Sequence, residues 1–450
     1  MDTSTVFKAY DIRGTYPDQI NEDVARAVGS AFATFVGAPQ ILVARDMRPS
    51  GTSLAHAFGE GARAVGVEVV DLGLASTDFL YFATGYLDAP GAMFTASHNP
   101  AQYNGIKLCR AGARPIGADT GLGEIAELTE SFYDQPAEGV LAPLVARELI
   151  DEWVDHVHSF VDVTALRPLR IVADTANGMG GYVVPRVFAS LPFDVEIIYG
   201  ELDGSFPNHP ADPINPENLV DLQRRVLEVG ADVGLAFDGD ADRVFLIDER
   251  AQPLSGSTTT AMVAAAMLGR NPGATILYNL ICSRSVPEAI DEFGGVGVRT
   301  RVGHSYIKQV MAETGAIFGG EHSGHYYYRD NYRADSGIIT ALVMLELMSQ
   351  SGQPLSQLAA PFDRYAVSGE INTRVVNPLA TVAALSDAMR ERGTNVDELD
   401  GLTVEYDTWW FNLRPSNTEP LLRLNVEAED EASCAVHVGE VLALIKGAQP

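Results

Sequence analysis

Short runs of apolar, largely β-branched residues recur along the chain, and successive runs bracket segments of helical length. Three such strand–helix–strand units are expected, over residues 39–71, 169–199 and 274–300. Each covers about 30 residues, which is the size of a βαβ crossover. The runs contain few polar positions, as strands require when helices cover both faces of their sheet.

The pattern changes after about residue 366, where short strands alternate with two helices. This part predicts a smaller C-terminal α+β domain. The three-fold repeat before it predicts three similar mixed α/β domains, each a βαβ-containing sheet sandwiched by helices. The predicted domains are residues 1–145, 146–252, 253–365 and 366–450. A single Rossmann-type domain with insertions is the alternative, and the wide spacing of the three units disfavours it.

The chain has 450 residues, of which 46% are hydrophobic and 20% charged, so it can fold around buried cores. Acidic residues outnumber basic ones by 60 to 31, and the formal net charge is −29. A surface of this charge repels nucleic-acid phosphates and anionic lipids, so neither nucleic acid nor membrane is an expected partner. A phosphorylated substrate would need basic residues gathered locally around it.

The three cysteines, Cys109, Cys282 and Cys434, lie far apart and show no metal-binding or redox spacing. We therefore expect reduced thiols in a cytoplasmic protein. The first residues lack the basic and apolar regions of a signal peptide. No stretch of about 18 consecutive apolar residues occurs, so no membrane span is expected.

The first of four loops that carry chemistry is Thr95-Ala-Ser-His-Asn-Pro100, which follows the apolar residues Ala92-Met-Phe. Ser97 stands at a strand end with His98 beside it, as an activated nucleophile would. The plainer alternative is a turn in which the serine only caps the backbone. The GxSxG pattern of serine hydrolases is absent from this loop.

The second loop is Asp238-Gly-Asp-Ala-Asp-Arg243, between expected strands over 232–237 and 244–248. Three carboxylates at alternate positions repel one another unless a cation lies among them. Their hard oxygen ligands suit Mg²⁺. The EF-hand pattern fails, because no glutamate follows at its twelfth position and the flanking segments are strands. The alternative is a solvated acidic turn, which the apolar flanks disfavour.

The third loop is Gly319-Gly-Glu-His-Ser-Gly-His325, without the HExxH zinc pattern. Glu321, Ser323 and His325 alternate, so an extended segment would place them on one side. A carboxylate, a hydroxyl and an imidazole side by side suit sugar hydroxyls and acid/base chemistry. The alternative is a structural turn with a hydrogen-bonded histidine.

The fourth loop is Arg414-Pro-Ser-Asn-Thr418, which gathers a guanidinium, two hydroxyls and an amide within five residues. That composition suits a phosphate dianion. By itself the segment is equally compatible with a polar hairpin loop.

The four loops, in this order, and the opening Tyr10-Asp-Ile-Arg-Gly14 resemble the α-D-phosphohexomutase superfamily, above all its bacterial phosphomannomutase/phosphoglucomutase branch. The resemblance covers nearly the whole chain. It implies an enzyme that interconverts mannose 6-phosphate and mannose 1-phosphate, and also the glucose phosphates. It further implies a phosphoserine, one Mg²⁺ per active site, and hexose 1,6-bisphosphate as intermediate and activator. Hexose phosphates are the implied partners of a monomer or weak dimer.

The resemblance also implies a role for each matched residue. The implied catalytic residues are Ser97, His98, Arg13, Lys107, Arg243 and His325. The implied metal ligands are phosphorylated Ser97, Asp238, Asp240 and Asp242. The implied substrate-binding residues are Tyr10, His304, Lys308, Glu321, Ser323, Arg414, Ser416, Asn417 and Thr418. Within this last group, the third-loop residues would bind sugar hydroxyls and the fourth-loop residues would grip the phosphate that does not react.

Two positions depart from the family pattern. Ile281 stands where some members carry a lysine, and His322 stands where the pattern often has methionine. The glucosamine branch usually has glutamine at the second position, so a phosphoglucosamine mutase is an alternative function. A metal-dependent sugar phosphatase would use the same aspartates but release phosphate. A non-catalytic sugar-phosphate-binding protein would not need Ser97 or the aspartates.

Overall fold

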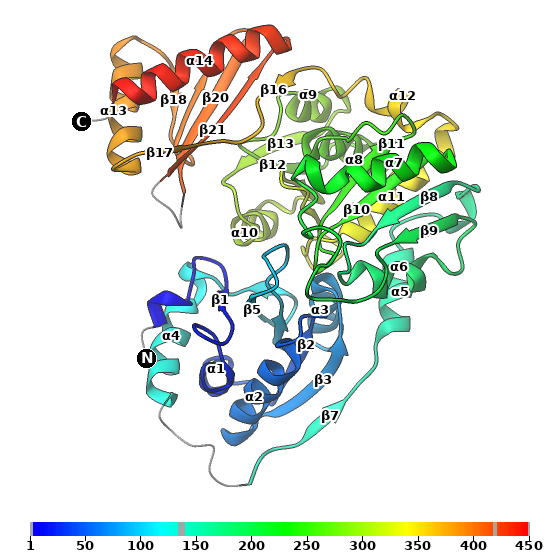
Figure 1. Cartoon of the computed structure of the whole chain (residues 1–450), viewed down its shortest axis with the longest axis vertical. Coiled ribbons are helices and arrows are strands. Elements are labelled where there is room, and N and C mark those ends of the chain that lie inside the picture. The colour runs from blue at the N-terminus through cyan, green and yellow to red at the C-terminus, as the bar shows by residue number, and fades with distance from the viewer. Residues whose placement is uncertain (1–2, 134–139, 417–420, 449–450) are drawn as a thin grey trace.

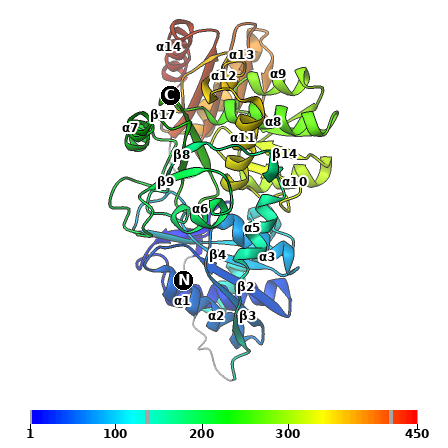
Figure 2. The ribbon, with the colours of Figure 1, turned by 90° about the vertical axis from the view of Figure 1, so that its right-hand side faces the viewer.

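The structure is a computed structural model that describes residues 3–133, 140–416 and 421–448. Its elements form four units in chain order (Figure 1). The first unit, drawn in blue, and the last, drawn in orange and red, lie at opposite ends of the molecule in both views (Figures 1 and 2). The second and third units lie between them.

The first unit is built on a seven-stranded sheet with the order β1-β5-β4-β2-β3-β7 and β6 paired to β5. Strands β2, β3, β4 and β7 are parallel, and β5 runs antiparallel between β4 and β1. Its elements are β1 (Ile12–Thr15), α1 (Glu22–Val36), β2 (Gln40–Arg45), α2 (Gly51–Ala64), β3 (Glu68–Leu74), α3 (Thr77–Tyr86), β4 (Gly91–Phe94), β5 (Tyr103–Arg110), β6 (Arg114–Pro115), α4 (Leu122–Phe132) and β7 (Leu144–Ala146).

The second unit has a four-stranded sheet with the order β11-β10-β8-β9, in which only β11 is antiparallel. Its elements are α5 (Ile150–His158), β8 (Arg170–Asp174), α6 (Gly180–Phe188), β9 (Asp194–Ile198), α7 (Val220–Val229), β10 (Val233–Phe237) and β11 (Val244–Asp248).

The third unit has a four-stranded sheet with the order β13-β12-β14-β15, and again only the last strand is antiparallel. Its elements are α8 (Gly256–Arg270), β12 (Thr275–Asn279), α9 (Ser285–Glu292), β13 (Val296–Thr300), α10 (His304–Thr314), β14 (Phe318–Gly320), β15 (Tyr326–Tyr328), α11 (Gly337–Ser351) and α12 (Leu355–Ala359).

The same four-strand arrangement occurs in all three units. Numbered along the chain within each unit, the strands β3-β2-β4-β5, β9-β8-β10-β11 and β13-β12-β14-β15 all have the order 2-1-3-4. The prediction of three similar α/β domains is therefore confirmed. The loops around Ser97, Asp240 and Glu321 all join the third strand of this arrangement to the fourth, so they occupy equivalent positions in the three sheets.

The fourth unit is a six-stranded antiparallel sheet with helices, as the predicted α+β domain requires. Its elements are β16 (Ala366–Val367), β17 (Ile371–Arg374), α13 (Pro378–Glu391), β18 (Val396–Asp397), β19 (Leu402–Glu405), β20 (Trp409–Pro415), β21 (Leu421–Ala428) and α14 (Glu431–Gly447). Strands β16 and β17 both pair with β21, and Gly369 between them has a left-handed φ of +65°.

One hydrophobic core joins the first three units, beside smaller cores within each of them, whereas the fourth unit has a separate core. One cluster of buried side chains runs from Phe79 through Leu235 to Ile276, one residue from each of the first three units. The fourth unit buries a separate cluster that includes Phe411 and Leu424. The predicted domain boundaries stay a prediction. None of the helices in the described parts of the chain is long and apolar enough to cross a membrane.

Helices α1 and α2 pack with their backbones in direct contact. A Cβ atom at Gly61 in α2 would lie 1.9 Å from the carbonyl oxygen of Arg26 in α1. Ser30 also donates a hydrogen bond of 2.9 Å to the carbonyl oxygen of Gly61. The absence of a side chain at this position therefore sets how closely the two helices cover the first sheet.

Substituting Gly61 by alanine should lower the melting temperature, although alanine is the better helix former. The new methyl group meets a main-chain atom that cannot rotate away, and such overpacking costs about 1–3 kcal/mol, more than the ~1 kcal/mol of helix propensity gained. Gly123→Ala is the control, because no atom lies within 4 Å of a Cβ built there. Calorimetry of both variants checks this, and equal melting temperatures would contradict it.

Candidate active site

Ser97 lies in the loop between β4 and β5 and is only 5% exposed. Its φ of +48° is left-handed, which is uncommon for a residue with a side chain. The hydroxyl of Thr95 accepts a 2.9 Å hydrogen bond from the Ser97 amide. The Ser97 hydroxyl donates to Asp238 Oδ2 at 2.7 Å and lies 3.3 Å from His98 Nδ1. Burial and the nearby Arg243 hold the pKa of His98 well below its usual value, so this imidazole is neutral at pH 7.

The acidic loop is a tight turn between β10 and β11. Asp238, Asp240 and Asp242 are at most 1% exposed, and one oxygen from each lies within 4.8 Å of the others. Ala241 turns the chain with a φ of +60°. A Cβ at Gly239 would lie 2.4 Å from the Ser97 carbonyl oxygen, so only glycine lets this loop approach the serine loop.

Two cations compensate the acidic loop. Lys107 Nζ lies 2.8 Å from Asp240 Oδ2 and 2.8 Å from Asp242 Oδ2. Arg243 Nε donates to Asp238 Oδ2 at 2.9 Å. Burial opposes ionisation of Asp240, but the ammonium of Lys107 outweighs it and holds the pKa of Asp240 well below its usual value. Burial raises the pKa of Asp238, and Arg243 opposes that rise.

Two carboxylate oxygens in this loop fit a metal ion. Oδ1 of Asp240 and Oδ1 of Asp242 are buried and accept no hydrogen bond from the described residues. A buried carboxylate oxygen without a donor is costly unless a cation lies nearby. The loop can therefore hold a metal ion, with the Ser97 hydroxyl oxygen directly beside it.

Tyr10 lies just before β1, and Arg13 lies within β1, the edge strand of the first sheet. Arg13 donates to the Asn99 side chain at 2.6 Å and forms an ion pair with Asp11, so it lies beside the serine loop. Tyr10 instead faces the third unit, where its hydroxyl lies 3.5 Å from the Val302 carbonyl oxygen. Burial raises the pKa of Tyr10 to about 12, so it is a neutral hydrogen-bonding group at pH 7.

The third loop is a hairpin, so the predicted extended segment is wrong. Glu321 donates its amide to the His325 carbonyl oxygen at 2.9 Å, and Gly324 takes a φ of +83° between them. The turn nevertheless brings the predicted side chains together. Ser323 Oγ and His325 Nδ1 are hydrogen-bonded at 3.0 Å, and His325 Nε2 lies 3.8 Å from Asp242 Oδ1.

Glu321 is 2% exposed and is held by three donors, which the sequence did not indicate. Asn279 and the Gly303 amide donate to Oε1 at 3.2 and 3.1 Å, and the Tyr327 hydroxyl donates to Oε2 at 2.8 Å. A carboxylate has about four acceptor positions. Among the described residues, three donors therefore leave one acceptor position of Glu321 without a hydrogen bond.

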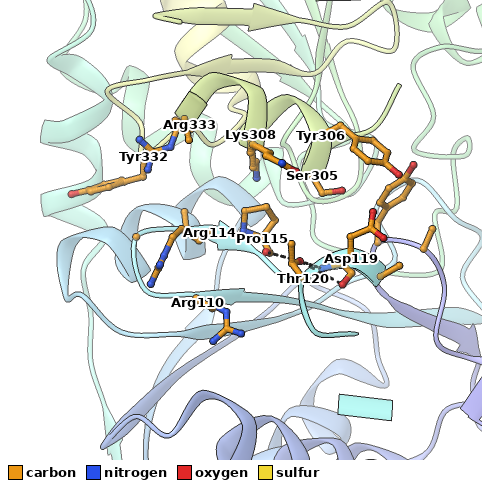
Figure 3. Close-up of a pocket in the computed structure, with 18 residues that line it drawn as sticks. Arg110, Arg114, Pro115, Asp119, Thr120, Ser305, Tyr306, Lys308, Tyr332 and Arg333 are labelled. Carbon is orange, nitrogen blue, oxygen red and sulfur yellow. Dashed lines mark hydrogen bonds between the residues drawn. The ribbon is translucent and has the colours of Figure 1, made fainter. Parts of the chain in front are cut away.

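Lys308 forms part of the wall of a cavity of about 520 Å³ between α10 and the region around β6 (Figure 3). Its ammonium is 3.1 Å from Asp335 Oδ1 and 3.8 Å from the centre of the Tyr81 ring. The Lys308 side chain is only 2% exposed, and its charge is paired with that of Asp335. Its predicted contact with substrate stays a prediction. The side chain of His304 lies outside the described part of the structure.

Arg414 lies near the end of β20, which runs to Pro415. This guanidinium donates to Glu370 Oε2 at 3.0 Å, and its Nε is buried without an acceptor among the described residues. Ser416 donates its amide to the Leu421 carbonyl oxygen at 2.9 Å. Asn417 and Thr418 lie outside the described residues.

The two departures from the family pattern lie near this site. Ile281 is 8% exposed and apolar. His322 Nδ1 lies 3.2 Å from Ser257 Oγ at the start of α8. Burial lowers the pKa of His322, so a neutral imidazole stands within the hairpin, directly after Glu321.

All four domains of the phosphoglucomutase/phosphomannomutase family match this chain. Alpha/beta/alpha domain I matches residues 4–134, domain II residues 151–252, domain III residues 255–365 and the C-terminal domain residues 370–442. The chain therefore belongs to the phosphoglucomutase/phosphomannomutase family, within the α-D-phosphohexomutase superfamily, as its loops predicted.

Full-length relatives agree with this assignment. A protein described as phosphohexose mutases from Xanthomonas campestris pv. campestris is 39% identical over 99% of this chain and 100% of its own length. A phosphomannomutase of Escherichia coli strain K12 is 39% identical over 95% of each chain. A phosphoglucomutase/phosphomannomutase family protein from Burkholderia thailandensis, of known structure, superposes with a TM-score of 0.90 at 32% identity, over 100% of this chain and 99% of that one.

Lys107→Met should make the protein's stability depend more strongly on a divalent metal ion, with Mg²⁺ as the ion to test. The substitution leaves Asp240 and Asp242 without their ammonium, and breaking a buried pair in this way costs about 3–5 kcal/mol. In chelator, the melting temperature should fall well below that of the exposed-lysine control Lys446→Met. Added Mg²⁺ should then raise it by more than in the wild type. Equal responses of the two variants would contradict the electrostatic role of Lys107.

Proposed function

We propose that this chain interconverts hexose 6-phosphates and hexose 1-phosphates, with both mannose and glucose phosphates as substrates. The phosphomannomutases that are 39% identical to it over nearly their full length support this reaction. The observation that carries the proposal is the buried Ser97 hydroxyl, 2.7 Å from a carboxylate within a group of three. A hydroxyl beside a cation site and two fixed positive side chains is suited to carry a phosphoryl group.

In the proposed reaction, phospho-Ser97 gives its phosphoryl group to the free hydroxyl of the sugar phosphate. The P–O bond to Ser97 Oγ breaks, a P–O bond to the sugar forms, and the sugar hydroxyl gives its proton to a base. His325 is the candidate base, because its imidazole is 23% exposed and lies next to the acidic loop. The resulting hexose 1,6-bisphosphate turns over and returns its other phosphoryl group to Ser97.

Asp238, Asp240, Asp242 and the Ser97 oxygen are proposed to hold one Mg²⁺. The donor-free Oδ1 atoms of Asp240 and Asp242 support this assignment, and oxygen-only ligands suit this ion. When bound, Mg²⁺ would neutralise negative charge on the transferring phosphoryl group. Lys107 and Arg243 add positive charge on either side of the same loop.

The far end of the substrate is proposed to lie between the third and fourth loops. Glu321 and Ser323 would bind ring hydroxyls, and Arg414 would hold the phosphate that does not react. For the bisphosphate to reorient, the third and fourth loops must release the sugar and the phosphate that they hold. The separate core of the fourth unit supports such motion, because units joined by polar contacts move more readily than units that share a core.

A cytoplasmic location and a monomeric or weakly dimeric state stay predictions. The three cysteines are buried free thiols, which agrees with a reducing compartment.

Ser97→Ala should lower kcat by about 10³-fold or more, as loss of a nucleophile does. The variant should keep its fold. Intact-mass analysis after incubation with glucose 1,6-bisphosphate should show one phosphate on the wild type and none on the variant. Ser53→Ala, in α2 of the same unit, serves as the control and should be phosphorylated like the wild type. Equal phosphorylation of the Ser97→Ala variant would refute the assignment. Release of inorganic phosphate at the rate of sugar phosphate consumption would favour a phosphatase.

Mannose 1-phosphate and glucose 1-phosphate should be used with similar efficiency. The two sugars differ only in the configuration at C2. The substrate must bind in two orientations, with either end facing Ser97, so a side chain that contacts C2 in one orientation would not contact it in the other. Discrimination should be ~1–2 kcal/mol, or roughly 5–30-fold in kcat/KM. The measurement compares both sugars with glucosamine 1-phosphate. A preference above about 10³ for one sugar would indicate a dedicated C2 contact, with His322 as the first residue to test.

A further inference from the structure

Arg48, just after β2, holds the main chain of the serine loop with four hydrogen bonds. Its NH1 donates to the carbonyl oxygens of Pro100 and Tyr103, each at 2.9 Å. Its NH2 donates to the carbonyl oxygens of Ser97 at 2.9 Å and Asn99 at 2.6 Å. The side chain is completely buried. One guanidinium therefore fixes four peptide units of the loop that carries the nucleophile.

The serine loop needs such a restraint because its backbone is strained at the nucleophile. Ser97 has a φ of +48°, and a residue with a side chain stays in this region only where its surroundings enforce it. Thr95 fixes the amide on one side of Ser97, and Arg48 fixes the carbonyl on the other. Together they set the direction in which Oγ leaves the backbone, toward Asp238.

The described residues around Arg48 neutralise its charge and enclose it. Asp46 balances its charge, with Oδ2 at 3.3 Å from Nε and Oδ1 accepting the Arg48 amide at 2.9 Å. The Phe206 ring of the second unit lies 5.1 Å from the guanidinium. A Cβ at Gly204 would lie 2.7 Å from Arg48 Cα, so this second-unit loop closes directly over it. The arginine is thus shielded from solvent and from any substrate.

We propose that Arg48 is the positioning residue for the nucleophile, and that it holds Ser97 Oγ, and any phosphoryl group on it, in register with the acidic loop. This inference rests on the proposed phosphoryl transfer at Ser97. Arg48 acts only through the loop and touches no reacting atom. Its loss should therefore slow the chemical step while leaving substrate affinity, set by the third and fourth loops, nearly unchanged.

Arg48→Lys is the main test, because lysine keeps the charge but cannot span four carbonyl oxygens from one planar group. We expect kcat with glucose 1-phosphate to fall at least about 30-fold, since displacement of a reacting group by about 1 Å can cost about 100-fold. KM should stay within about threefold, and Ser97 should accept phosphate from glucose 1,6-bisphosphate more slowly. Val28→Ala, which truncates a buried core residue of α1, controls for loss of stability alone and should keep its kcat.

Asp46→Asn separates the hold on the loop from the buried charge pair, and it serves also if Arg48→Lys does not fold. Asparagine keeps an acceptor oxygen for the Arg48 amide and for Thr95, which also hydrogen-bonds Asp46, and the four carbonyl bonds remain, so kcat should stay within about fivefold of the wild type. A 30-fold loss in Asp46→Asn would overturn the proposal, as would an Arg48→Lys kcat within threefold of the wild type. An inactive wild type would instead refute the proposed function itself, so the two failures are distinguishable.

Discussion

The site depends on how the charge of three buried carboxylates is compensated. At about 4 Å and an effective dielectric constant near 20, two like charges repel by about 4 kcal/mol, so the acidic loop could not stay folded and ionised alone. Lys107 and Arg243 supply two positive charges, which leaves a formal charge of −1. A phosphoryl group on Ser97 adds about −2. A divalent cation would restore the balance, so the proposed metal loop and the proposed phosphoserine loop would depend on each other.

The repeated sheet explains how these loops meet. In each of the first three units the chemistry lies in the connection from the third strand to the antiparallel fourth. Lys107, which neutralises the acidic loop of the second unit, projects from β5, the fourth strand of the first unit. The Arg243 residue of the second unit forms a β-bridge with His325 of the third. A shared core among the three units keeps these equivalent connections at fixed distances, which a pre-organised site requires.

The acidic loop could be predicted from its own residues. Three aspartates at alternate positions between apolar strands favour a cation site over a solvated acidic turn. The first and fourth loops were less specific by themselves. They indicated a function only together with the other loops, through the order of all four along the chain. The partners that hold these loops were not predictable. Arg48 precedes Ser97 by 49 residues and carries no motif of its own, and its importance follows from β2 and β4 being parallel neighbours. The alternation of Glu321, Ser323 and His325 suggested an extended segment, but the glycine between the last two residues allows a turn instead.

In the fourth unit, a carboxylate already pairs with the arginine that is expected to hold a phosphate. Arg414, the cation expected to hold a phosphate, already donates to Glu370, and Arg423 lies 3.5 Å from the same carboxylate. Glu370 is one-third exposed, so solvent weakens its attraction for the arginine. A phosphate dianion carries more charge and more acceptor oxygens than a carboxylate, so it can displace Glu370. In the proposed cycle the carboxylate would keep Arg414 oriented and neutralised before the phosphate binds, and it would take up the arginine again when the phosphate leaves.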